Sequence, residues 1–85
     1  MPYIRQERRD IFDKELQNIG ENLDQKGDLT YCFYKLCCLF LKGRRVSYEN
    51  LSSVMSCLDD AKQEWYRKKV ADYEDKKIEE NGDIK

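Results

Sequence analysis

The sequence predicts an all-α protein of three helices, and three observations lead to this prediction. Apolar residues recur at spacings of three and four, which is the period of an amphipathic helix. Strands are not indicated, because apolar and polar residues do not alternate and β-branched residues are few. Four glycines and one proline divide the 85 residues into long stretches that can form helices. We expect a single helical domain over residues 1–85, with helices over about residues 10–24, 29–42 and 48–80.

The first predicted helix follows an N-terminal arm over residues 1–9. Asp10 or Asp13 is the expected N-cap, because a short carboxylate accepts hydrogen bonds from the free N–H groups of a first turn. Gly20 weakens the last turn, since glycine is a poor helix former. The apolar face of this helix consists of four residues at helical spacing: Phe12, Leu16, Ile19 and Leu23.

The second predicted helix is apolar on almost every side. Asp28 is its expected N-cap, and Gly43 fits the position just after its end. Lys35 is the one charged residue among residues 31–41. A helix of this kind is normally buried all round, and two further helices of so short a chain can hardly cover it. The sequence therefore predicts self-association, with these candidate interface residues on the second helix: Phe33, Cys37 and Leu41.

The third predicted helix starts after Ser47 as N-cap and runs without glycine or proline to Glu80. Its length is about 50 Å, whereas a compact domain of this size is about 30 Å across. The helix therefore either packs on another subunit or bends or frays after about Val70. We favour packing in a homo-oligomer, and we expect a disordered tail over residues 81–85. An apolar stripe follows most of this helix: Leu51, Val54, Met55, Leu58, Ala61, Trp65, Tyr66, Val70 and Tyr73. Its last part supplies the remaining candidate interface residues: Tyr66, Val70 and Tyr73.

Catalytic and metal-binding chemistry is not indicated. Histidine is absent, which removes the commonest general base and metal ligand near neutral pH. Three of the four cysteines lie on the second helix at spacings that do not match a zinc site. The carboxylates of the last third alternate with lysines, as on a solvated helix surface. We expect no enzyme, no metal site and no cofactor.

Membranes and duplex nucleic acids are not the expected partners. No apolar run approaches the roughly 20 residues of a membrane span, and the charged start of the chain does not resemble a secretory signal. The net charge is −1, and no segment is basic enough to coat a duplex. The sequence therefore predicts a cytoplasmic protein without membrane contact.

Aromatic residues next to basic ones are the most suggestive binding feature. Two rings and three cations are consecutive over residues 65–69, and rings that stack on bases beside cations that meet phosphates are typical of nucleotide sites. Alternatively, the rings belong to the core and the cations cover them, as the position of Trp65 on the apolar stripe suggests. Six tyrosines also suit a protein–protein surface. The candidate residues for binding a ligand or partner are Tyr3, Arg44, Arg45, Tyr66, Arg67 and Lys68.

Three segments resemble an uncharacterised family of short phage, prophage and bacterial proteins. They are the opening Met1-Pro2-Tyr3-Ile4-Arg5-Gln6-Glu7, the segment Gly27-Asp28-Leu29-Thr30-Tyr31-Cys32, and the end Tyr73-Glu74-Asp75-Lys76-Lys77-Ile78-Glu79-Glu80-Asn81-Gly82-Asp83. The resemblance covers essentially the whole chain and implies a phage or bacterial setting, but it supplies no catalytic or binding residues.

We therefore expect a small non-enzymatic binding protein of phage or mobile-element origin in the cytoplasm of a bacterial host. It would act by occupying a host target, for instance to antagonise host defence. One alternative is a sponge that sequesters a small nucleotide signal, for instance a cyclic one, between its subunits. The other alternative is a nucleic-acid-binding regulator.

Overall fold

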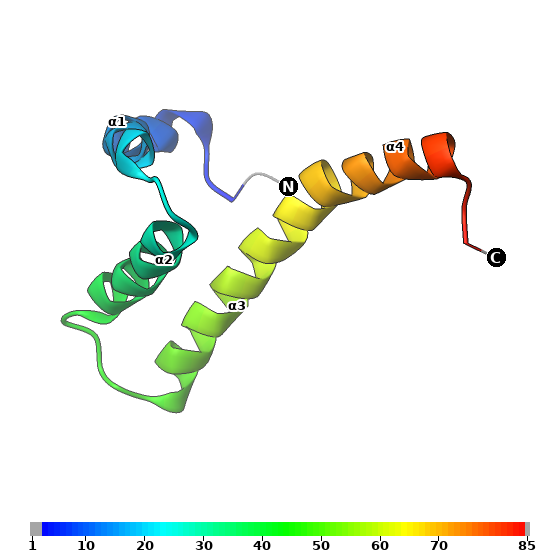
Figure 1. Ribbon diagram of the computed structural model, residues 1–85. Coiled ribbons are helices and arrows are strands. Elements are labelled where there is room, and N and C mark those ends of the chain that lie inside the picture. Colours follow the sequence, from blue (N-terminus) through cyan, green and yellow to red (C-terminus); the bar gives the residue numbers. More distant parts are fainter. Residues whose placement is uncertain (1–2, 85) are drawn as a thin grey trace. The chain divides into compact units, whose positions relative to one another are not determined.

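The computed structural model describes residues 3–84 and divides into two units, one up to Arg44 and one from Arg45 onward, which are described separately (Figure 1). The described residues contain helices and no strand, as predicted. The first unit holds α1 (Gln6–Asn22) and α2 (Lys26–Leu41). The second unit holds α3 (Tyr48–Trp65), the π-helical turn η1 (Tyr66–Val70) and α4 (Ala71–Asn81). These last three elements are consecutive and form the long third helix, of 34 residues. That the chain is a single domain stays a prediction.

Helix α1 begins four residues before its predicted start. The backbone N–H groups of Arg8 and Arg9 donate to the carbonyl oxygen of Arg5, at 3.0 and 3.3 Å, so residues 6–9 of the predicted arm form the first turn. Neither Asp10 nor Asp13 is the N-cap, which is Arg5. Residues 6–9 are good helix formers, but they carry little of the apolar pattern on which the prediction depended. Met1 and Pro2, the start of the predicted arm, lie outside the described residues.

The start of α2 differs from the prediction in the role of Asp28. Gln25 is the N-cap, and Asp28 lies three residues further on, inside the helix. Its Oδ2 accepts hydrogen bonds from the backbone N–H groups of Gln25 and Asp24, each at 2.9 Å. These bonds, the one from Gln25 first, hold the pKa of Asp28 below its usual value. Asp28 therefore still satisfies free N–H groups, but from the position that a capping box assigns to an acidic residue.

The end of α2 is as predicted at Gly43. The helix ends at Leu41, and Gly43 has φ +80°, a left-handed conformation that glycine adopts without steric cost. Arg44 Nε donates to the carbonyl oxygen of Phe40 at 2.7 Å, and its guanidinium carbon lies 4.1 Å from the centre of the Phe40 ring. The side chain of Arg44 thus caps the C-terminus of α2, because it donates to one of the carbonyl groups that the last turn leaves free.

The third helix begins as predicted and ends one residue later than predicted, so that Asn81, the first residue of the predicted tail, is helical. Ser47 Oγ accepts a hydrogen bond from the backbone N–H of Asn50 at 3.2 Å, which makes Ser47 the N-cap. Gly82, with φ +84°, follows the last helical residue Asn81. The helix changes direction at η1 (Figure 1). A bend of the overlong helix is therefore present, whereas packing on another subunit stays a prediction. The predicted tail includes Lys85, which lies outside the described residues.

Neither unit contains a buried side chain among the described residues. Within the first unit, α1 and α2 do not pack along each other. Trp65 on the third helix is 63% exposed and Phe33 on α2 is 51% exposed. Within its own unit Trp65 is therefore not part of a core, and each unit leaves its apolar residues in contact with solvent.

Candidate interaction surfaces

The π-helical turn η1 keeps the apolar stripe of the third helix on one face. Trp65 and Val70 are five residues apart, which would place them about 140° apart on a regular α-helix. In η1 the backbone N–H of Ala71 donates to the carbonyl oxygen of Tyr66, so the turn contains one more residue than an α-helical turn. The extra residue brings Val70, and after it Tyr73, back to the face of Trp65.

The three consecutive candidate residues Tyr66, Arg67 and Lys68 lie together on η1. Oε1 of Glu64 lies 2.6 Å from a terminal nitrogen of Arg67 and 3.2 Å from Nζ of Lys68. The hydrogen bond from Lys68, followed by the contribution of Arg67, lowers the pKa of Glu64 to about 2. Glu64 therefore stays charged at neutral pH, and its one negative charge is shared between the two cations.

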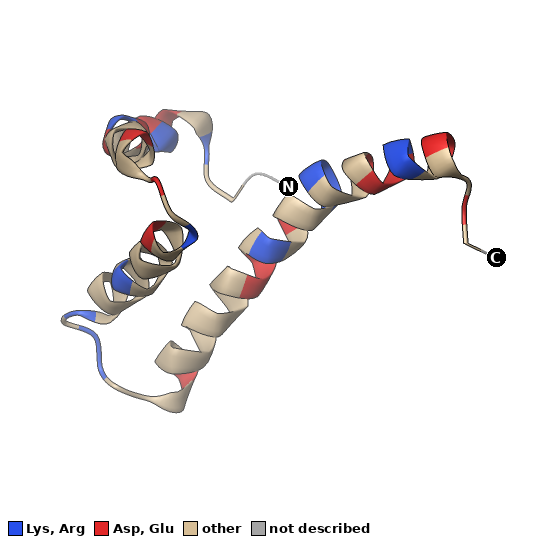
Figure 2. Cartoon of the chain, viewed as in Figure 1, with Lys and Arg blue, Asp and Glu red and all other residues tan. Residues whose placement is uncertain are grey.

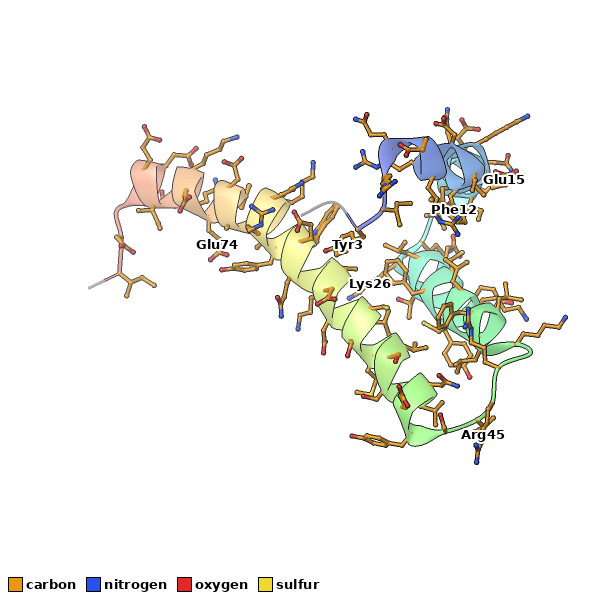
Figure 3. The ribbon with its side chains drawn as sticks, turned by 180° about the vertical axis from the view of Figure 1, so that it is seen from behind. Tyr3, Phe12, Glu15, Lys26, Arg45 and Glu74 are labelled. Carbon is orange, nitrogen blue, oxygen red and sulfur yellow. The ribbon has the colours of Figure 1, made fainter. Side chains whose placement is uncertain are left out.

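Tyr66 is also engaged on its own helix. A hydrogen bond from its hydroxyl to Glu74 on α4 raises the pKa of Tyr66, and Glu74 is labelled in Figure 3. Among the described residues, Lys69 is the cation of η1 for which no ion pair is found. Arg67 and Lys68 thus share a carboxylate on their own helix, and this surface suits a protein partner better than a phosphate group.

The other candidate binding residues lie on other segments of the chain. Tyr3 precedes α1 and is 52% exposed. Arg44 is used to close α2. Arg45 begins the second unit, where its carbonyl oxygen accepts a hydrogen bond from Asn50 Nδ2 at 2.6 Å. The structure therefore brings Tyr66, Arg67 and Lys68 together on one turn, and the other three candidates lie on other segments of the chain.

A basic group at the start of α1 was missed by the sequence reasoning. Arg5, Arg8 and Arg9 lie at the positive end of the helix dipole, where cations are unfavourable. Tyr3, Arg5 and Arg9 line a shallow, open depression there. Three arginines at a helix N-terminus, where cations are unfavourable, are the sequence feature that could have indicated a binding surface here.

The predicted interface residues of α2 share one face of that helix. Phe33, Cys37 and Leu41 are spaced by four residues. Phe33 is exposed, whereas Cys37 and Leu41 are half-buried. On the third helix, Val70 is half-buried and Tyr73 is 61% exposed. Each predicted interface face therefore keeps an exposed aromatic ring, and self-association through these faces stays a prediction.

A second face of α2 carries tyrosines. Tyr31 and Tyr34 are three residues apart and are 62% and 70% exposed. They lie on the side of the helix away from Phe33, at about 160° and 100° from it. A hydrogen bond with Cys38, on the same side, raises the pKa of Tyr34. The helix thus has an apolar face and a more polar, tyrosine-rich face.

The cysteines and carboxylates of the described chain do not gather into a metal site. All four cysteines are free thiols, and no group of three or more potential ligands lies together among residues 3–84. In the same residues, no helix is both long enough and apolar enough to cross a membrane.

Comparison with known proteins places the chain in one family. Neither a curated protein nor a solved structure matches it. The family model DUF6899, described as a domain of unknown function, matches residues 1–84. This match confirms the resemblance to an uncharacterised family, because it covers nearly the whole chain. The protein belongs to the DUF6899 family.

Proposed function

We propose that this protein is a non-enzymatic binding protein that acts by occupying a protein of a bacterial host. We further propose that it is of phage or mobile-element origin, works in the host cytoplasm and forms a homo-oligomer. One observation carries the proposal: α2 has two different aromatic faces, and neither is covered by other residues of its unit. Burial of apolar surface is the main favourable term in association, so a helix of this kind gains stability from partners on both sides.

The two faces suit different partners. The face of Phe33, Cys37 and Leu41 is fully apolar, as in the obligate interfaces of homo-oligomers. The face of Tyr31 and Tyr34 combines large rings with hydroxyl groups. Tyrosine is enriched in non-obligate protein–protein interfaces. We assign the apolar face to self-association and the tyrosine face to the host protein. A component of host defence is the kind of target that would explain such a protein in a phage.

The experiment separates the two faces by substitution. A host protein cross-linked to the chain in bacterial cells is identified, purified and titrated calorimetrically with the pure chain. We expect the double variant Tyr31→Ser/Tyr34→Ser to keep the oligomeric mass and to weaken target binding at least tenfold. Tyr48→Ser, which removes a tyrosine that is 87% exposed on α3, is the matched control and should bind as the original chain does. Unchanged binding by the double variant, or no binding by any purified host protein, contradicts the proposal.

A second candidate function is the sequestration of a small nucleotide, and the depression at the start of α1 favours it. Arg5 and Arg9 are suited to phosphate groups, because a guanidinium binds phosphate through two parallel hydrogen bonds. The ring of Tyr3 is suited to stacking on a base. By contrast, Arg67 and Lys68 are already paired with Glu64. For the nucleic-acid-binding regulator we find no comparable support, since acidic and basic residues are interspersed along α4 (Figure 2).

Calorimetry with mononucleotides and cyclic dinucleotides tests this second function. We expect the original chain to bind at least one of these nucleotides. Arg5→Ala/Arg9→Ala should weaken this binding at least tenfold, and Arg67→Ala should change it little. No heat of binding with any of these nucleotides removes the candidate.

A further inference from the structure

Asn81 differs from the other asparagines of the chain in the residue that follows it. Gly82 follows Asn81, whereas Asn18, Asn22 and Asn50 precede isoleucine or leucine. An asparagine side chain can react with the backbone nitrogen of the next residue, and glycine leaves that nitrogen accessible because it has no Cβ. Asn81 and Gly82 are both exposed at the end of α4. The pair therefore carries the two groups that spontaneous deamidation requires, at a place open to water.

The last turn of α4 keeps these two groups apart while it is formed. The backbone N–H of Gly82 donates to the carbonyl oxygen of Ile78 at 2.8 Å. Asn81 is the last helical residue, and a helical side chain points back towards the N-terminus, away from the nitrogen of the following residue. The reaction therefore requires this turn to open. Helix ends without buried side chains open at little cost in free energy, and α4 has none among its residues.

The charges around Asn81 make a carboxylate less compatible with this turn than the asparagine is. Glu79, Glu80 and Asp83 are its neighbours in sequence, and the C-terminus of a helix is the negative end of the helix dipole. Lys77 pairs with one of these carboxylates, since its Nζ lies 3.1 Å from Oε2 of Glu80. Deamidation adds a further carboxylate here, so it destabilises the turn whose opening allowed it.

We propose that Asn81 is a self-modification site that converts to aspartate and isoaspartate when the last turn of α4 opens, and that the product keeps this turn open. The backbone nitrogen of Gly82 attacks the side-chain carbonyl carbon of Asn81. As the new carbon–nitrogen bond closes a succinimide ring, the bond to the side-chain nitrogen breaks, and that nitrogen leaves as ammonia with the proton of the Gly82 amide. Water, the sole co-reactant, then opens the ring at either carbonyl. Because ammonia is lost, the change runs in one direction, and α4 shortens at its C-terminus as the protein ages.

Peptide mass spectrometry of the purified chain, sampled over days at neutral pH, tests the proposal. The peptide with Asn81 should gain the mass difference between a hydroxyl and an amino group, and it should split into aspartate and isoaspartate forms. Asn18, Asn22 and Asn50 are internal controls and should react at least tenfold more slowly. In urea, which opens the turn, the reaction of Asn81 should be faster. Conversion of Asn81 no faster than that of the controls overturns the proposal, and equal rates with and without urea overturn the requirement for opening.

Hydrogen exchange followed by NMR tests the effect of the product. Asn81→Asp should speed the exchange of the Gly82 amide, because its bond to Ile78 forms less often. Asn81→Gln keeps an uncharged amide, closes a ring far more slowly and should leave this exchange unchanged. Asn18→Asp adds the same charge to α1 and is the matched control. Unchanged exchange in Asn81→Asp would contradict the claim that the product keeps the turn open.

Discussion

The backbone N–H of Ala71 donates its hydrogen bond to the carbonyl oxygen of Tyr66, five residues earlier in the chain. This bond defines the π-helical turn within the long third helix, and π-helical turns frequently occur at functional sites. Here the turn has a clear consequence. It inserts one residue between Trp65 and Val70, and the apolar stripe continues on the same face of the helix.

Deletion of Lys69 should remove the π-helical turn without disturbing the stripe. Val70 would then follow Trp65 by four residues, which keeps both on one face of a regular α-helix. We expect the helix content to be unchanged or higher and self-association to persist, as measured by circular dichroism and sedimentation equilibrium. Deletion of Ser56 is the control, because it rotates Leu51 away from Leu58 by about 100° and should weaken association. Loss of association on deletion of Lys69 alone would mean that the partner contacts the π-helical turn itself.

Protonation of Glu64 should weaken the third helix in acid. Its pKa of about 2 lies below the ordinary value of 4.5, so the charged form is stabilised in the helix. The stabilisation is fully present above pH 4.5 and is lost as the pH falls towards 2. A side-chain NMR titration should place the midpoint near 2, and Lys68→Met should move it towards 4.5. A midpoint already near 4.5 in the original chain would show that the ion pairs do not form.

Removal of the Ser47 hydroxyl should destabilise the start of α3. This hydroxyl accepts the backbone hydrogen bond from Asn50, and loss of an N-cap of this kind costs about 1 kcal/mol. Thermal unfolding followed by circular dichroism should show the loss for Ser47→Ala. The same substitution at Ser56, in the middle of α3, should be neutral or slightly stabilising, since alanine is the better helix former. Equal effects at the two positions would rule out a capping role for Ser47.

Alanine should have opposite effects at two glycines. Gly43 has φ +80°, and a left-handed conformation costs a residue with a Cβ about 1 kcal/mol. Gly20 lies within α1, where a Cβ would meet nothing within 4 Å, and alanine there stabilises a helix by about 1 kcal/mol. Gly43→Ala should therefore lower the unfolding temperature and Gly20→Ala should raise it. A rise for Gly43→Ala would contradict the assigned end of α2.

The helices themselves could be predicted from the sequence because their signals are local. Ser47, Gly43 and Gly82 lie at helix ends where their chemistry is required, and the apolar period identified three helices correctly. Asp28 lies at the start of α2, as the sequence predicts, but three residues after the N-cap instead of at it. Sequence alone does not separate the two positions, because a carboxylate can accept hydrogen bonds from free N–H groups at either one. The first turn of α1 has no apolar period, and so its start was predicted too late.

The candidate binding residues were less predictable, because their roles depend on which side chains meet. Arg67 and Lys68 have the composition of a phosphate site, but both are paired with Glu64, one helical turn earlier. Arg44 instead stacks on Phe40 and closes α2. The π-helical turn had one sequence signal, the five-residue step from Trp65 to Val70, and it becomes interpretable only once the extra residue in the turn is seen.

The central claim is that one copy of this chain leaves apolar faces that a second copy covers. Sedimentation equilibrium of the original chain across micromolar concentrations, combined with thermal unfolding at the same concentrations, tests it most directly. We predict an average mass of at least twice 10.2 kDa and an unfolding temperature that rises with concentration. A mass of 10.2 kDa at every concentration, with a cooperative unfolding temperature that does not change, would contradict the claim.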